Sequence, residues 1–350
     1  MRLAPFRTDE ADPHLRGVAY GRALGADVRR GVTAYRDYFA GWDLDPATVA
    51  EVVAGSVEAL DAWDPSGLAE LAGVAEGAAT GLDGVVALNA RTELLARSAR
   101  WRGSECSTVA MVGGSAPRTL QTWDWHVDLT PVGVCYEHPS PTGGVKAFTE
   151  PGMLAKIGVN AAGLGLHLNI LHHRDDAEAV GVPVHAVARR ILQEADSVAA
   201  AVALARSAPL GASTVLTVAD ATGEAACLEL SPVGVGVVRP DEDGFLWHTN
   251  HFRDPALRPG EAVETGTTWD RGAHLRAQRT ALLASATAQQ RADAMCGVRR
   301  ERAPVNVRAD PALGPLEQWA TLLTVALDPA GFAMHLRPDA PGDGGPWTTV

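Results

Sequence analysis

The sequence predicts a layered α+β fold in which blocks of helices lie outside antiparallel strands. Three observations support this prediction. Apolar residues recur at helical spacing over most of the first hundred residues, short β-branched and aromatic runs follow residue 104, and residues 320–338 read as a hairpin that turns at Asp328, Pro329 and Gly331. A four-layer sandwich is compatible with this pattern, although periodicity does not establish it.

The first half of the chain divides near residue 104. Residues 14 to about 100 are expected to form successive helices, and Asp83 is a candidate N-cap for one of them. From residue 104 to about 171, short runs alternate with Gly and Pro, which predicts strands joined by tight turns.

The second half repeats this alternation. Residues 183–208 predict two helices, the second starting at Asp196 or Ser197. Strands are expected again over 213–252, and residues 270–299 are expected to be helical. We find no internal repeat, glycine-rich phosphate loop or HExxH motif in the sequence.

Composition narrows the class of protein. The 350 residues are 46% hydrophobic and 21% charged, which is typical of a globular protein. The formal net charge of −12 disfavours nucleic acid or an anionic membrane as the main partner, because both attract basic surfaces. The sequence has no apolar run of the roughly 18–20 residues that a membrane span needs, and no secretory signal at its N-terminus. We therefore expect a soluble, cytoplasmic protein.

Cysteines and lysines are both sparse. The cysteines are Cys106, Cys135, Cys227 and Cys296. They are widely spaced without a CxxC pair, so neither a zinc site nor another metal site is suggested, and the expected cytosolic location disfavours disulfides. Only two of the thirty basic residues are lysines, Lys146 and Lys156, a bias typical of GC-rich bacterial genomes.

One cysteine stands in an unusual context. Cys106 lies between Glu105 and the hydroxyl residues Ser107 and Thr108, just ahead of an alternating apolar run. Asp124 lies between two tryptophans in the next strand-like run. One interpretation is a buried structural thiol and an unrelated acid, since cysteine is among the most buried residue types. The other is a nucleophile at the start of a strand, with a polar partner on the neighbouring strand.

Six motifs in order favour the second interpretation. They are "LNARTEL" at 88–94, "ECST" at 105–108, "QTWDW" at 121–125, "KIGVNAAGLGLHLNIL" at 156–171, "HTNHF" at 248–252 and "VNVRADP" at 305–311. With them the chain resembles, over most of its length, the acyl-coenzyme A:isopenicillin N acyltransferase family (peptidase family C45). This family is a branch of the N-terminal nucleophile hydrolases, with bile-salt and penicillin V hydrolases as more distant relatives. The resemblance implies a four-layer αββα sandwich.

The resemblance also implies self-cleavage before an internal cysteine. The matching cut lies between Glu105 and Cys106, so residues 1–105 and 106–350 would become the two chains of one domain. The new α-amine, with a pKa of about 7.7–8.0, would serve as base for a thiol whose ordinary pKa is about 8.5. Relatives commonly have glycine before the nucleophile; Glu105 is stiffer and departs from that pattern.

Further residues match family roles around the nucleophile Cys106. Asn250 occupies the position of the oxyanion donor, and Asp124 matches the aspartate that orients the amine and thiol. Arg308 matches an arginine near the nucleophile, where it would keep Asp124 ionised. Each residue also has a purely structural interpretation. Asn250 could cap the end of a strand, Asp124 could be an acid in a turn, and Arg308 could be a solvated surface residue.

Two supporting groups complete the predicted site. The residues expected to take part in processing are Glu105, Cys106, Ser107, Thr108 and, more weakly, Ser231. The side chains expected to line a substrate pocket are Trp123, Trp125, His126 and Trp247. Their alternatives are backbone hydrogen bonding for the hydroxyls and core packing for the aromatics.

These features predict an enzyme that cleaves or forms an amide bond through a thioester on Cys106, without cofactor or metal. Its partner would be a small N-acyl amine, amino acid or peptide-like amide. Hydrolysis is favoured over acyl transfer, because the chain is acidic and no arginine cluster lies beside Cys106 in the sequence. The alternatives are an acyl-CoA-dependent N-acyltransferase and a processing-dead relative that acts as a binding or scaffold protein.

Overall fold

The computed structural model describes residues 1–101, 106–114, 116–262 and 266–350. Within them the strands form two sheets. The eight-stranded sheet has the order β1 (Arg2–Arg7), β4 (Val132–His138), β5 (Val145–Thr149), β6 (Ile157–Asn160), β7 (Leu164–Ile170), β8 (Thr214–Asp220), β9 (Ala225–Ser231) and β10 (Gly234–Val238). The six-stranded sheet has the order β11 (Phe245–His248), β2 (Ser107–Met111), β3 (Arg118–His126), β12 (Trp319–Asp328), β13 (Ala333–Pro338) and β14 (Thr348–Thr349).

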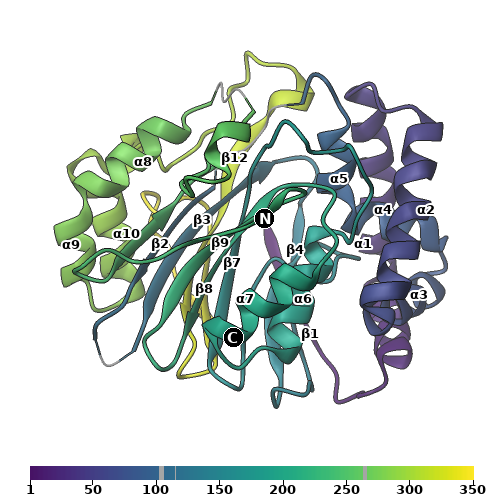
Figure 1. Ribbon diagram of the computed structural model, residues 1–350, viewed down its shortest axis with the longest axis horizontal. Helices are drawn as coiled ribbons and strands as arrows, with labels where there is room; N and C mark the ends of the chain where they lie inside the picture. The colour runs from purple at the N-terminus through teal and green to yellow at the C-terminus, as the bar shows by residue number, and fades with distance from the viewer. Residues whose placement is uncertain (102–105, 115, 263–265) are drawn as a thin grey trace.

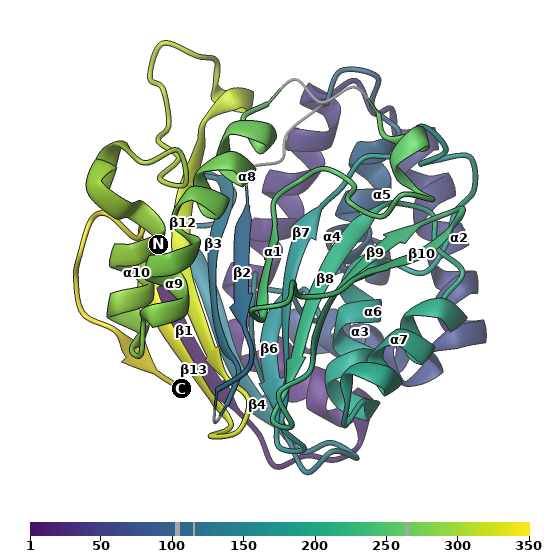
Figure 2. The same cartoon turned by 60° about the vertical axis from the view of Figure 1, so that its left-hand side comes forward.

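The two sheets pack face to face between layers of helices (Figures 1 and 2). The eight-stranded sheet is covered by α6 (Val184–Glu194) and α7 (Val198–Ser207). The six-stranded sheet is covered by α8 (Thr268–Ala277), α9 (Arg279–Ala284) and α10 (Ala288–Cys296). Short 3-10 helices are Arg258–Gly260, Gly297–Arg302 and Pro315–Glu317. This arrangement confirms the expected α+β fold and its four αββα layers.

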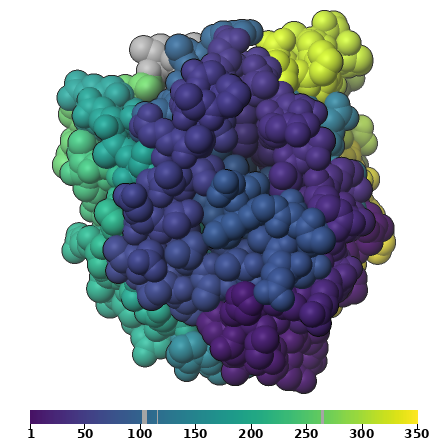
Figure 3. Space-filling model, turned by 90° about the vertical axis from the view of Figure 1, so that its right-hand side faces the viewer, coloured from purple at the N-terminus to yellow at the C-terminus, as the bar shows by residue number. Residues whose placement is uncertain are grey.

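The N-terminal region adds a block of helices beside α6. They are α1 (Pro13–Gly41), α2 (Pro46–Trp63), α3 (Pro65–Ala78), α4 (Leu82–Asn89) and α5 (Arg91–Ala96). Apolar side chains of α1, α2, α3 and α4 share one core cluster with the outer face of the eight-stranded sheet and with α6 and α7. Figure 3 shows this block, in purple to blue, covering one face of the molecule. The N-terminal hundred residues are therefore part of the domain's core.

Two local features of this region differ from the expectations. Strand β1, which pairs in parallel with β4, was not anticipated from the sequence. Its proline, Pro5, is tolerated because β1 is an edge strand. Asp83 was expected to cap a helix, but α4 begins two residues earlier than that cap implies, with Gly81 at the cap and Asp83 in the first turn.

Other expectations are confirmed. Ser197 caps α7 by accepting a hydrogen bond from the backbone N–H of Ala200. The C-terminal hairpin is formed by β12 and β13, whose connection begins after Asp328. These elements could be located because their caps and turns are local in sequence.

The pairing of β2 brings distant residues together at one end of the six-stranded sheet. Ser107 on β2 lies opposite Thr122 on β3, in antiparallel register. Thr108 lies opposite His248, the last residue of β11, which is also antiparallel. Three segments therefore meet at this end of the six-stranded sheet. They are the residue before β2, the C-terminal part of β3 and the segment after β11.

Glycines permit unusually close packing between α1 and α3. A Cβ placed on Gly17 would lie 2.1 Å from the Glu70 carbonyl oxygen and 2.8 Å from the Val74 backbone nitrogen. A Cβ on Gly31, in the same helix, would meet nothing nearer than the Pro151 carbonyl oxygen, at 3.7 Å. Of these two positions, only the first needs glycine for the helices to approach.

We predict that Gly17→Ala lowers the free energy of unfolding by at least about 2 kcal/mol, because backbone atoms would have to move apart. The matched control, Gly31→Ala, should be neutral or stabilising by up to about 1 kcal/mol through better helix propensity. Denaturant unfolding of both variants measures the difference. Equal stabilities would contradict the close approach of α1 and α3.

Candidate active site

The thiol of Cys106 is held by the backbone of the neighbouring strand. Cys106 directly precedes β2, and its side chain is buried. The Asp124 N–H donates to the sulfur at 3.5 Å, and the thiol reaches the Asp124 carbonyl oxygen at 3.7 Å. Burial, followed by the charge of Asp124, raises the pKa of the Cys106 thiol to about 12. In the uncut chain this cysteine is therefore a protonated, weak nucleophile.

A hydroxyl links β2 to the carboxylate of Asp124. The Thr122 hydroxyl accepts a hydrogen bond from the Ser107 backbone N–H at 3.2 Å and donates to Asp124 Oδ2 at 3.4 Å. Asp124 is 1% exposed. Asp124 was identified from the sequence, whereas Thr122, two residues earlier on the same face of β3, was not. The two-residue spacing of Thr122 and Asp124, which places both side chains on one face of a strand, could have identified Thr122 from the sequence.

The Asn250 side chain is fixed at both ends of its amide. Nδ2 donates to the Ile170 carbonyl oxygen at 2.9 Å, and Oδ1 accepts from Arg271 at 2.8 Å. The Asn250 backbone N–H donates to the Thr268 hydroxyl at 2.8 Å. These contacts set which amide atom faces which neighbour, because an acceptor and a donor cannot exchange places there.

Arg271 joins the candidate nucleophile to Asn250. It lies in the first turn of α8 and is fully buried. Its Nη1 donates to the Cys106 carbonyl oxygen at 2.6 Å and to the Ser107 hydroxyl at 3.0 Å, while Nη2 donates to Asn250 Oδ1. This residue was missed at the level of sequence. Nothing in the expected helix distinguishes a buried arginine from a solvated one, since its partners are distant in the chain.

The structure does not bring Arg308 into this group. Its guanidinium is half exposed and forms a two-pronged ion pair with Asp343. The expectation that Arg308 keeps Asp124 ionised is therefore corrected: the arginine in contact with the Cys106 segment is Arg271. The sequence motif placed Arg308 near a loop whose direction it did not determine.

The predicted processing residues have different positions. The Ser107 hydroxyl contacts Arg271, and the Thr108 hydroxyl donates to Asn169 Oδ1 at 2.7 Å. Ser231 accepts from the backbone N–H of Val233 in its own turn, at 3.5 Å. Glu105, the residue before the predicted cut, lies outside the described residues. Of these three hydroxyls, that of Ser107 is the one in contact with the arginine that holds the Cys106 carbonyl.

The aromatic residues expected to bind substrate divide into two groups. Trp123, Trp125 and His126 are no more than 3% exposed and pack in the core: Trp123 against Phe148, and His126 between aromatic neighbours. Their packing corrects the expectation that they line a pocket. Trp247 is half-buried and lines a surface cavity beside α8.

A second buried charge cluster lies behind Trp125. Glu150 forms ion pairs with Arg91 and, at 2.6 Å, with Lys156, and it accepts from the Tyr35 hydroxyl. The Arg91 guanidinium stacks 3.7 Å above the Trp125 ring. Burial, then repulsion by Arg91, lowers the pKa of Lys156 to about 7, although Glu150 opposes this. Arg91 also lowers the pKa of the Cys106 thiol, after the larger effect of Arg271.

Among the described residues we find no metal-binding cluster, no disulfide and no membrane-spanning helix. Within the described ranges, no three histidine, cysteine or acidic side chains are grouped as a metal site requires. The four cysteines are all buried and unpaired in disulfides. No helix in the part of the chain that the structure describes has the length and apolarity needed to cross a membrane.

Comparison with known proteins decides the family. The model of the acyl-coenzyme A:6-aminopenicillanic acid acyl-transferase family matches residues 113–295, just over half of the chain. The chain belongs to this family. The matched segment contains Asp124, Asn250 and Arg271, and it begins shortly after Cys106. It therefore confirms the resemblance inferred from the six motifs.

Two known proteins illustrate this relationship. The 40 kDa form of acyl-coenzyme A:6-aminopenicillanic-acid-acyltransferase from Emericella nidulans is 30% identical over 186 residues, 52% of this chain and 50% of that protein. The match thus spans about half the length of this curated relative. A single-residue variant of the conjugated bile acid hydrolase from Clostridium perfringens superposes with a TM-score of 0.51 at 11% identity, covering 70% of this chain and 92% of that one. This second likeness concerns the fold alone.

We predict that Arg271→Lys slows any Cys106-dependent reaction by roughly 10²-fold, because a single ammonium cannot reproduce the fork that binds Cys106, Ser107 and Asn250 together. The control is Arg279→Lys, which alters an arginine on the neighbouring helix α9 that pairs with surface aspartates. Reaction rates and thermal unfolding of both variants are the measurements. Arg271→Lys with unaltered rates would contradict the organising role of Arg271.

Proposed function

We propose that this protein is a self-processing enzyme that cleaves or forms an amide bond through a thioester on Cys106. The observation that carries the proposal is the contact of one buried arginine, Arg271, with both the Cys106 carbonyl and the Asn250 amide. The substrate would be a small N-acyl amine, amino acid or peptide-like amide, and no cofactor is required. Membership of an acyltransferase family supports the reaction class.

In the proposed reaction, Cys106 becomes an N-terminal residue after a cut at Glu105–Cys106. Its new α-amine accepts the thiol proton, and the sulfur attacks the carbonyl carbon of the substrate. The amine leaving group departs with a proton, which leaves an acyl thioester on Cys106. Water or a second amine then attacks the thioester and releases the thiol.

Asn250 would stabilise the negative oxygen that forms in each attack. An amide NH₂ has two hydrogens, and the Ile170 carbonyl accepts one of them. The second is the donor proposed for the oxyanion. Because Arg271 and Ile170 hold the amide in place beforehand, no reorganisation is needed when the charge develops.

Processing would also act as an activation step. In the uncut chain the thiol has a pKa raised to about 12 by burial and Asp124, so it is almost entirely protonated at neutral pH. The proposed cut supplies a base on the same residue, with an ordinary pKa of about 7.7–8.0. The intact chain is therefore the proposed inactive precursor.

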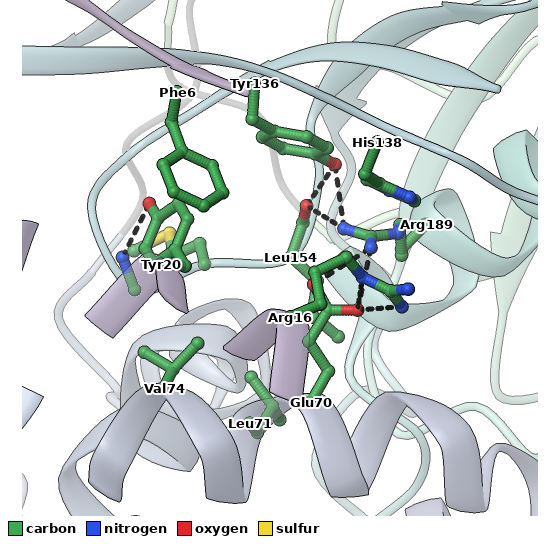
Figure 4. A pocket seen from close by; sticks show the side chains of 12 residues that line it. Phe6, Arg16, Tyr20, Glu70, Leu71, Val74, Tyr136, His138, Leu154 and Arg189 are labelled. Atoms are coloured by element: carbon green, nitrogen blue, oxygen red, sulfur yellow. Dashed lines mark hydrogen bonds and ion pairs between the residues drawn. The ribbon is translucent and has the colours of Figure 1, made fainter. Parts of the chain in front are cut away.

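Buried ion clusters would keep the two products of the cut together. Arg16 and Glu70 lie before the predicted cut and Arg189 after it, and both arginines bind the Glu70 carboxylate (Figure 4). Although burial opposes ionisation, Arg189 and Arg16 lower the pKa of Glu70 to about 2. The Arg91–Glu150 ion pair crosses the same boundary. Removing one partner of such a buried pair typically costs about 3–5 kcal/mol, so we propose a stable heterodimer.

We predict that denaturing mass spectrometry of the purified protein finds two fragments, residues 1–105 and 106–350, with Cys106 at the new N-terminus. Cys106→Ala should remain a single chain without turnover, because alanine provides no nucleophile for either step. The control is Cys135→Ala, which removes another buried thiol and should be cut normally. An active enzyme that remains a single 350-residue chain would exclude the α-amine mechanism.

A second pair of variants separates the roles of Asn250 and Asp124. Asn250→Ala should lower kcat by roughly 10²-fold or more with little change in KM, because an oxyanion donor acts mainly in the transition state. Asp124→Asn should impair cleavage and turnover together, since it alters the group beside the thiol and the Thr122 hydroxyl. If Asn250→Ala instead raised only KM, Asn250 would be a substrate-binding residue.

A further inference from the structure

A surface cavity between β11 and α8 is lined in part by His251, the residue that follows Asn250 in the chain. Its volume is about 310 Å³, which is at the lower end of the range for small-molecule sites. The described residues that line it are Trp247, His251, Phe252, Arg253, Arg258, Trp269 and Arg276. They include three arginines and two tryptophans but no acidic side chain. This composition contrasts with the formal charge of −12 for the whole chain.

The arginines are stacked on the two indole rings. Arg253 and Arg276 lie 4.1 Å and 5.6 Å from the centre of the Trp247 ring. Arg258 lies 5.8 Å from the Trp269 ring, whose face also stacks on His251 with a centroid distance of 3.8 Å. Stacking restrains a guanidinium plane while leaving its N–H groups, which point outward in that plane, able to bind an oxyanion.

The two exposed arginines of the cavity have no carboxylate partner among the described residues, whereas Glu229 and Asp241 act on the charge of Arg253. Arg253 donates to the Trp247 carbonyl oxygen at 2.6 Å, a neutral acceptor. Arg258 and Arg276 are both exposed, and neither forms an ion pair with any residue that the structure describes. Burial, then the charges of His248, Arg253, Arg271 and Arg258, lowers the pKa of His251 to about 3. The cavity therefore presents two exposed guanidinium groups, those of Arg258 and Arg276, that are available to an anion.

We propose that this cavity binds an anionic oxygen group, a carboxylate or a phosphate, carried by the substrate. The inference rests on the proposed function and extends it to substrate class. His251, which lines the cavity, is adjacent in the chain to Asn250, the proposed oxyanion donor. We therefore assign the anion anchored at Arg258 and Arg276 to the substrate that reacts at Cys106.

Binding is tested without any need for turnover. Isothermal titration of the purified protein with benzoate and with inorganic phosphate should show saturable binding of at least one anion, weakening as salt is added. The double variant Arg258→Gln/Arg276→Gln should bind about tenfold more weakly. The control is Arg206→Gln, an exposed arginine on α7, which should bind as the parent protein does. Binding unaffected by the double variant, or no saturable binding of either anion, would overturn the proposal.

The two probes distinguish two sources of the anion. Tighter binding of benzoate would indicate that the site binds the carboxylate of an acidic amide, such as an N-acyl amino acid. Tighter binding of phosphate identifies it with a phosphorylated acyl donor. Either result supports the site, because the shared chemistry is an oxyanion held by guanidinium groups.

Kinetics provide the second test. If benzoate is the tighter ligand, an N-acyl amino acid should be cleaved with a kcat/KM at least about tenfold above that of its methyl ester, and the double variant should remove this preference. Equal rates on both compounds, together with no anion binding, would reject the proposed anion site. The proposed amide chemistry would not be affected by that result. Anion binding in a protein without any amide turnover would instead reject the proposed function and keep the site.

Discussion

The buried guanidinium of Arg271 is the interaction on which the candidate site depends. A charge without exposure to water must be hydrogen-bonded, or its burial would be very costly. Its bonds reach the Cys106 carbonyl, the Ser107 hydroxyl and the Asn250 side chain, and so connect the start of β2, the segment after β11 and helix α8. Because the start of β2 is far from the other two segments in the chain, the site exists only when the outer helical layer packs on the six-stranded sheet.

A second set of buried charges, formed by Arg91, Glu150 and Lys156, connects other segments of the chain. Arg91 belongs to the "LNARTEL" motif and Lys156 to the "KIGVN" motif, and the structure shows that both bind Glu150. Two motifs that resembled family sequences separately are therefore parts of one ion cluster behind Trp125. The cluster joins the N-terminal helices to the eight-stranded sheet. It also gives one of the chain's two lysines, Lys156, a buried position beside Glu150, where burial lowers its pKa to about 7.

The sequence predicted the layered α+β fold from local patterns, whereas the family resemblance implied its four layers and part of the candidate site. Helical periodicity, local caps and hairpin turns are short-range signals, and Cys106, Asp124 and Asn250 stand in recognisable motifs. The positions of Arg271 and Arg308 could not be predicted from such short-range signals. Both are arginines near expected loops or helix starts, and only tertiary packing determines that one is buried beside Cys106 while the other pairs with Asp343. Likewise, strand periodicity could not tell whether the tryptophans of β3 face a pocket or the core.

The most direct test of the account is to locate the acyl group during turnover. The enzyme is mixed with an excess of an amide substrate and quenched in acid within milliseconds, and its peptides are mapped by mass spectrometry. The account predicts a mass increase equal to the acyl group on the peptide that begins with Cys106, and its absence when Cys106 has first been alkylated. An acyl group on any other residue, or undiminished turnover after alkylation of Cys106, would contradict the account.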